Sequence, residues 1–186
     1  MLSNLLRSAN LFHLLFFIDS ELATIKRSTG CPYCGGSLHQ SNYVRQPRGG
    51  PVGLPEEFSL RRSLCCGRDG CRRRSAPDSC LFMGRRVYWR CVVLVATVLM
   101  QRRRESQSIG QLSILLGISG KTIMRWFDYF TEAFANSFEW LRIRGFLPAT
   151  VSNDWLPVNF LEYCIMQSQD ALTGLVMCCR LLGRGG

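Results

Sequence analysis

The sequence predicts a mostly helical fold that also contains a small β-sheet held together by a metal ion. Apolar residues cluster at helical spacing in residues 1–28 and 85–145, whereas residues 29–83 are rich in Gly, Pro, Cys and Arg. Four regions follow from this pattern. They are an N-terminal helical extension (1–28), a small β module (29–83), a helical domain (85–145), and a linker with a C-terminal helical tail (146–186).

The first region is predicted to be helical and to end at the polar sequence RSTG. Its apolar run 11–18 resembles the hydrophobic part of a signal peptide only weakly, because one Arg precedes it and no small-residue cleavage site follows. Residues 1–20 are therefore either an amphipathic helix or the product of an upstream start codon. The apolar run 91–100 is too short to span a bilayer. We expect a soluble protein with no membrane partner.

The second region carries two cysteine pairs at metal-ligand spacing. Cys31 and Cys34 form a CxxC motif followed by two glycines, and Cys66 and Cys71 are separated by four residues. Two pairs of thiolates on two loops are the usual ligands of a structural zinc ion. The sequence therefore predicts a zinc ribbon with these four cysteines as ligands. Cys65 is the competing third ligand, and we prefer Cys66.

Two further interpretations of the cysteines follow from the same sequence. A redox protein could use Cys31 and Cys34, since the tetrapeptide CPYC also occurs in glutaredoxins, although a redox CxxC usually opens a helix in a βαβ setting. A secreted disulfide scaffold fits less well, because such cysteines are usually spread evenly along a short chain. Several of the ten cysteines here lie in apolar runs. We therefore expect a reducing cytoplasm.

The positive charge is concentrated in one stretch of the chain. The formal net charge is +10, and residues 45–104 hold fourteen Arg against four acidic residues, which accounts for the whole excess. Such a field favours a polyanionic partner, above all a phosphate backbone. Arg68 and Arg72 are placed to donate to ligand thiolates, and Arg72, Arg73 and Arg74 together predict a phosphate clamp. Further arginines add to this cluster: Arg61, Arg62, Arg85 and Arg86.

Residues 109–130 carry the spacing of two crossing helices. The apolar positions that would bury one side of both are Leu112, Leu116, Ile118, Ile123 and Trp126. Gly117 suits the turn, Ser113 the point of closest approach, and Ser119 the N-cap of the second helix. With a preceding helix at about 86–103, these segments predict a three-helix helix-turn-helix domain.

The second helix of that pair would present three polar residues near its N-terminus. Lys121, Thr122 and Arg125 occupy the positions that face the major groove in a helix-turn-helix, and the backbone at Ser119 would approach a phosphate. The sequence therefore predicts DNA binding through these residues.

The last 40 residues predict neither a catalytic domain nor a small-molecule site. Their acids, Asp154, Glu162 and Asp170, lack a strand pattern and suit capping or surface roles, and His13 and His39 lie far apart in the chain. Pro157 is expected as the first residue of a helix that continues to residue 182 with an interruption near Thr173–Gly174. Residues 175–182 would pack on the core or form the surface of a homodimer.

The motif order resembles that of a bacterial family. The segments CPYCGG, RRSLCCGRDGCRRR, GRRVY and LGISGKTIMRW are similar to zinc-ribbon plus helix-turn-helix proteins of the transposase-like, insertion-sequence-associated type, over residues 29–145. The resemblance implies zinc on the four cysteines and DNA reading by residues 119–130. Such modules usually precede a catalytic domain, and this chain departs from that arrangement. The remaining alternative is an adaptor that docks on a polymerase or a transposase.

Overall fold

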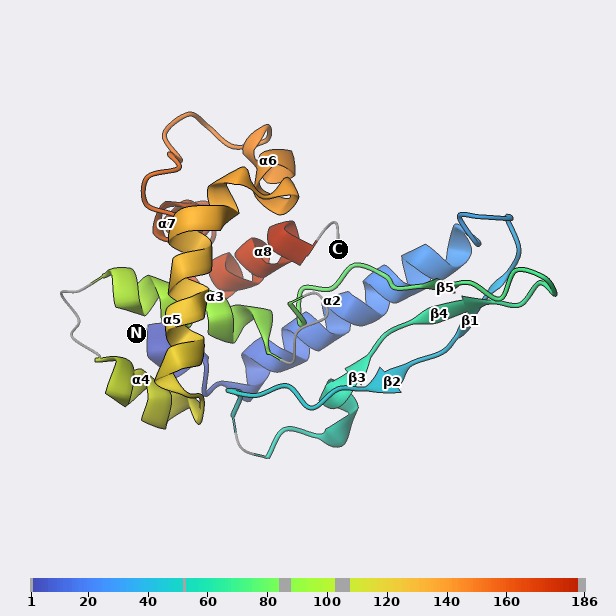
Figure 1. The fold of residues 1–186 in the computed structure, drawn as a ribbon, viewed down its shortest axis with the longest axis horizontal. Coiled ribbons are helices and arrows are strands. Elements are labelled where there is room, and N and C mark those ends of the chain that lie inside the picture. The colour runs from blue at the N-terminus through green and yellow to red at the C-terminus, as the bar shows by residue number, and fades with distance from the viewer. Residues whose placement is uncertain (1, 52, 84–87, 103–107, 184–186) are drawn as a thin grey trace.

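The computed structural model describes residues 2–51, 53–83, 88–102 and 108–183. Eight α-helices and two small antiparallel sheets lie within these ranges (Figure 1). The prediction of a mostly helical fold with a small β-sheet is confirmed. Figure 1 shows an elongated molecule with the three-stranded sheet toward one end and the helices α3 to α8 toward the other. No helix among the described residues is long and apolar enough to cross a membrane.

The N-terminal region forms two helices, α1 (Leu2–Leu5) and α2 (Ala9–Ser28). Leu11, Phe12 and Leu15 on α2 are fully buried in the same core as the helices that follow. Helix α2 contacts both α8 and strand β1. It therefore runs from the helices toward one end of the molecule to the three-stranded sheet toward the other (Figure 1). Residues predicted as an extension thus contribute to the main core. The predicted domain boundaries stay predictions.

Five short strands follow, paired in two sheets. The three-stranded sheet has the order β1-β4-β5 and comprises β1 (Leu38–Gln40), β4 (Leu64–Cys66) and β5 (Arg74–Ser75), all antiparallel. The second sheet pairs β2 (Tyr43–Val44) with β3 (Leu60–Arg61), which follows a 3-10 turn at Glu56–Ser59. We call residues 31–75 the cysteine end and residues 88–183 the helical end.

One contact joins the two ends, and a second ties helix α2 to residues 79–80. The loop after β2 packs on the helical end so closely that a Cβ on Gly49 would lie 2.7 Å from the Ile118 Cδ1 atom, and one on Gly50 2.5 Å from Trp89 Nε1. The buried carboxylate of Asp19 on α2 accepts from the Ser79 hydroxyl at 2.5 Å and from the Cys80 N–H at 2.7 Å. Burial raises the pKa of Asp19 despite these donors.

The helical end begins with α3 (Arg90–Gln101), followed by α4 (Ile109–Leu116) and α5 (Gly120–Asp128). The first helix was expected at about 86–103, and residues 84–87 and 103–107 lie outside the described ranges. Every residue from Arg90 to Leu99 is buried, because α3 is apolar on nearly all sides and packs within the helical end. A π-helical turn (Tyr129–Ala133), a 3-10 turn (Phe134–Asn136) and α6 (Phe138–Arg144) continue the helical path.

The C-terminal tail forms α7 (Val158–Met166) and α8 (Ala171–Gly183). The expected break at Thr173–Gly174 is wrong, since both residues lie inside α8. Gly174 is there because a Cβ at this position would lie 2.5 Å from the Ile165 Cα atom, so the two helices approach there. Pro157 precedes the first helical residue instead of being it.

The apolar segment near the C-terminus belongs to the core. Leu175, Cys178, Cys179 and Leu182 are buried against the main apolar cluster. Packing accounts for these residues, and a homodimer stays a prediction.

Candidate metal centre and nucleic-acid interface

Four cysteines meet at the tip of the cysteine end. The sulfur atoms of Cys31, Cys34, Cys66 and Cys71 all lie within 4.8 Å of one another. Cys31 and Cys71 are 3.8 Å apart, and Cys34 and Cys66 are 3.5 Å apart. Tetrahedral zinc with Zn–S bonds of about 2.3 Å requires sulfur separations of about 3.8 Å. The donor set and its spacing therefore fit a metal ion.

The first cysteine pair lies in a tight turn directly after α2. The Cys31 N–H donates to the Gly36 carbonyl, and the Gly35 N–H donates to the Cys31 carbonyl, both at 2.8 Å. Gly35 has a φ of 68°, in the left-handed region that favours glycine. A Cβ on Gly36 would lie 3.2 Å from the Cys66 sulfur and 3.4 Å from the Cys34 sulfur. The two glycines let the backbone close around the sulfur atoms.

Backbone N–H groups point at the sulfurs of three of these cysteines. The N–H groups of Tyr33 and Cys34 donate to Cys31 and lower the pKa of that thiol to about 7, against the opposing effect of burial. The Arg68 N–H lies 3.4 Å from the Cys66 sulfur, and the Arg73 N–H donates to Cys71. These donors stabilise thiolates, which are the form that binds a metal.

The pKa values of Cys66 and Cys71 are raised, in contrast to that of Cys31. For Cys66 the Arg68 N–H lowers the pKa, but burial and the neighbouring thiols outweigh it and raise the value to about 12. The pKa of Cys71 is also raised, because the Cys34 thiol and burial outweigh the Arg73 N–H. Four thiolates this close repel one another, and a divalent cation among them removes that repulsion. The arrangement suits a bound cation better than four free thiols.

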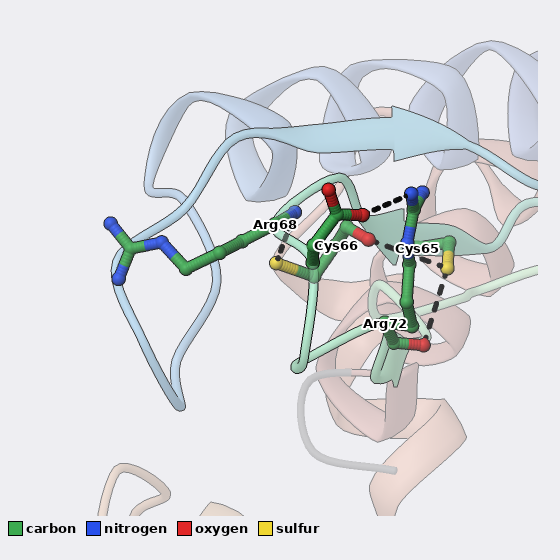
Figure 2. A network of polar contacts seen from close by, with 5 residues as sticks. Cys65, Cys66, Arg68 and Arg72 are labelled. Carbon is green, nitrogen blue, oxygen red and sulfur yellow. Dashed lines mark hydrogen bonds and ion pairs between the residues drawn. The ribbon is translucent and has the colours of Figure 1, made fainter.

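The structure distinguishes Cys66 from Cys65. The two are neighbours on β4, where successive side chains point to opposite faces. Figure 2 shows their sulfurs on opposite sides of the strand. The Cys65 sulfur lies 3.4 Å from the Arg72 carbonyl oxygen, away from the cysteine cluster, whereas Cys66 is buried in it.

The CxxC motif lies in a different setting from a redox pair. Helix α2 ends at Ser28, before the motif, and residues 32–34 form a turn. Cys31 and Cys34 each contact a sulfur of the other pair, Cys71 and Cys66 respectively. The two pairs thus act as one group of four.

Of the two arginines expected to donate to the ligand thiolates, Arg68 does so through its main-chain N–H, and Arg72 pairs with an acidic residue instead. Arg68 approaches the Cys66 sulfur through its main-chain N–H (Figure 2). Its guanidinium donates to the Cys34 carbonyl at 2.7 Å. Arg72 adopts a φ of 44°, and its guanidinium pairs with Asp69 at 2.6 Å. The prediction that the Arg72 guanidinium donates to a ligand sulfur is therefore wrong. Asp69, three residues earlier on the same turn, supplies a charged acceptor.

The other arginines of the predicted clamp fall into two groups. Arg73 stacks over the exposed Tyr33 ring at 4.6 Å, and Arg74 is exposed on β5, so both stay candidates for phosphate contact together with Arg72. Arg61 is buried and donates to the Pro77 carbonyl at 2.7 Å, and Arg62 donates to the Ser20 hydroxyl at 3.0 Å. Arg61 therefore holds the fold together and is not part of an exposed clamp. Arg85 and Arg86 lie outside the described residues.

Helices α4 and α5 cross around a left-handed turn. Gly117 has a φ of 61° and ends α4, as its position predicted. The Ser113 hydroxyl donates to the Ile118 carbonyl at 2.6 Å, which ties the turn back onto α4. Ser108 and Gln111 form a capping box at the start of α4. The S-x-x-Q pattern was the sequence signal for that cap, and the sequence reasoning missed it.

The predicted DNA-contact residues lie on the outer side of α5. Lys121 and Arg125 are exposed and Thr122 is half-buried, whereas Ile123 and Trp126 are buried against the core. Ser119 stands at the N-cap position, but within the described part of the chain its hydroxyl caps no backbone N–H. It lies instead 3.0 Å from the Thr122 hydroxyl. Ser119 is thus the N-cap residue that the sequence predicted, without a side-chain hydrogen bond to the helix backbone.

The acidic residues of the tail have structural partners. Glu162 pairs with Arg102 at 2.5 Å, and Asp170 accepts from the Thr173 N–H at 2.7 Å at the start of α8. That N–H lowers the pKa of Asp170. The His13 ring packs edge-on against Phe58. The ion pair and the cap are the kinds of role that the sequence predicted for these acids.

In comparisons with known proteins, no family model, no curated protein and no solved structure matches the chain.

Proposed function

We propose that the chain is a non-catalytic DNA-binding protein whose cysteine end is held by a structural zinc ion. The observation that carries the proposal is the pairing of a four-sulfur site with exposed basic residues on two separate elements. Arg73 and Arg74 lie beside the sulfur site, and Lys121 and Arg125 lie on α5. A net charge of +10 favours a polyanionic partner for such a surface.

Zinc is the metal that fits the donor set best. Four thiolates, two of them buried and two half-buried, match a structural site, in which the ion joins two loops. The ion would tie the turn at Cys31–Cys34 to strand β4 and the turn that follows it. Metal binding to such a module contributes on the order of 10 kcal/mol or more to folding.

The two basic regions would have different tasks. Arginines on the cysteine end would neutralise phosphates without regard to sequence, and Lys121, Thr122 and Arg125 would contact base edges from α5 in the major groove. Figure 1 places the two regions toward opposite ends of the molecule, so one protein would contact DNA at two separated places. The resemblance to transposase-like proteins implies DNA reading by residues 119–130 and is in line with this proposal.

The test is binding of a labelled DNA duplex by zinc-loaded protein at several salt concentrations. We expect binding that weakens as salt rises, with a linear dependence of log K on log salt. If the binding constant does not change with salt concentration, or if no binding is detected, DNA is rejected as the partner and the adaptor alternative is favoured. Metal content measured on the same sample decides the zinc assignment separately.

A further inference from the structure

A polar groove runs between helix α2 and the three-stranded sheet. It consists of two adjoining cavities of about 620 and 130 Å³, and Arg27 and Gln40 line both. The larger cavity extends to Gly30 and Gly35, beside the cysteine cluster. The smaller one extends toward Asn42 and Arg62. Figure 1 shows α2 lying alongside the sheet strands over this length.

The residues that line the groove are basic or neutral. Arg27 and Arg62 supply two positive charges, and no Asp or Glu stands among the described residues that line either cavity. On α2 the lining positions Ser20, Thr24 and Arg27 share one face, because residues four and seven apart lie one above the other on a helix. The groove therefore selects for an anionic ligand that also accepts hydrogen bonds.

Arg62 and Arg27 differ in how their guanidinium groups are held by neighbouring side chains. The Arg62 guanidinium is fixed by the Ser20 hydroxyl at 3.0 Å and by the Phe16 ring at 4.8 Å. The Arg27 side chain is exposed and makes no hydrogen bond or ion pair within the part of the chain that the structure describes. Asn42 uses its side-chain oxygen to accept from the Ser63 N–H, which leaves its amide N–H groups as donors.

Position at the end of α2 does not by itself explain Arg27. A cation near a helix C-terminus is stabilised by the helix dipole, and Lys26 in the same turn serves that purpose equally. Arg27, and not Lys26, lines both cavities. This difference within one helical turn provides a matched pair for a test.

We propose that the groove between α2 and β1 binds the sugar–phosphate backbone of a nucleic-acid strand, with Arg27 and Arg62 each contacting a phosphate. Two cationic positions in one continuous groove suit a ligand with repeating anions better than a single phosphate ion. This inference rests on the proposed DNA-binding function and adds a third contact surface to it, next to the metal centre. The neutral hydroxyl and amide groups between the arginines match sugar and phosphate oxygens.

The experiment compares Arg27→Gln with Lys26→Gln in the zinc-loaded full chain. Both variants lose one charge in the last turn of α2, so they alter net charge and helix dipole alike. Binding of a labelled oligonucleotide duplex is measured by fluorescence anisotropy across a salt series. We expect Arg27→Gln to reduce the slope of log K against log salt by about one unit, with the Lys26→Gln slope unchanged.

Two other outcomes overturn the inference. Equal slopes for the two variants would mean that the groove contacts no phosphate, even if the wild-type protein binds DNA. Absence of wild-type binding would instead reject the proposed function as a whole. As a second measurement, hydrogen exchange with mass spectrometry is run on the wild-type protein with and without the duplex. We expect the duplex to protect amides within residues 20–42, and protection confined to α5 would contradict the groove.

Discussion

Among the described residues, thirty-eight buried hydrophobic residues form the core that the helical end shares with residues 2–15, Phe58 and residues 80–83, whereas only four form the cluster at the cysteine end. Two of those four are Cys31 and Cys66, so Leu38 and Leu64 are the only aliphatic members. Burial of apolar surface contributes about 25 cal/mol per Å², so the stability of a module scales with its apolar core. The helical end can be held by packing, and the cysteine end needs another source of stability.

Glycine has a different structural role at each end of the molecule. At the cysteine end, Gly36 makes room for sulfur atoms. At the helical end, Gly174 makes room for a neighbouring helix. The same residue type thus supports a cluster of ligands in one place and helix packing in the other.

The largest expected effect is loss of a cysteine from the four-sulfur group. Cys66→Ser should abolish stoichiometric zinc binding and unfold the cysteine end, because metal binding contributes on the order of 10 kcal/mol to such a module. Zinc content and circular dichroism measure the result. Cys65→Ser, one residue away on the other face of β4, is the control and should bind zinc normally. Equal zinc binding by both variants would contradict the assignment of Cys66.

The next effect tests the helical end by itself. Trp126 is 2% exposed and packs edge-on against Tyr88, with ring centroids 4.9 Å apart. Trp126→Ala should lower the free energy of unfolding by about 3–5 kcal/mol through the cavity it leaves. Zinc content should stay at the wild-type value, since the cysteine cluster does not share this core. Loss of zinc in this variant would show that the fold of the cysteine end depends on packing in the helical end.

A smaller effect is expected at the contact between α7 and α8. Gly174→Ala places a Cβ 2.5 Å from the Ile165 Cα atom and should destabilise the protein by about 1–3 kcal/mol, measured by urea denaturation. Gly145→Ala is the control, because its Cβ would enter open space as far as the described residues extend. If both variants had wild-type stability, the close approach of the two helices would be wrong.

The smallest predicted change separates the DNA-contact tasks of the two ends. Arg125→Ala should reduce the preference for a cognate over a mismatched duplex by about 1–3 kcal/mol, because one base contact is lost. Arg73→Ala should weaken binding to all duplexes and lower the salt slope by about one unit. Competition binding with a selected duplex library gives both values. A uniform loss for Arg125→Ala would remove α5 as the element that reads bases.

Sequence patterns predicted features well where the local backbone or the local spacing alone determines the residue type. The turn at Gly117 followed from the need for a left-handed backbone, and the four cysteines followed from ligand spacing. The preference for Cys66 over Cys65 agrees with strand alternation, which spacing alone does not reveal.

Features that depend on contacts between distant parts of the chain could not be predicted from local sequence patterns. Gly174 read as a helix breaker because Ile165, its reason for being there, lies on another helix. Arg61 read as part of a surface charge cluster, yet its partner is the carbonyl of Pro77 in the segment after β5. The groove beside Arg27 arises only when α2 lies against β1, and no local motif predicts that contact.

The central claim is that a metal ion holds the cysteine end while packing holds the helical end. Hydrogen exchange with mass spectrometry, run on purified protein before and after addition of a zinc chelator, tests it most directly. The account predicts one zinc per chain, with chelation removing amide protection from β1, β4 and β5 and leaving α3, α5 and α8 protected. Unchanged protection of these three strands after chelation, or purified protein without metal, would contradict it.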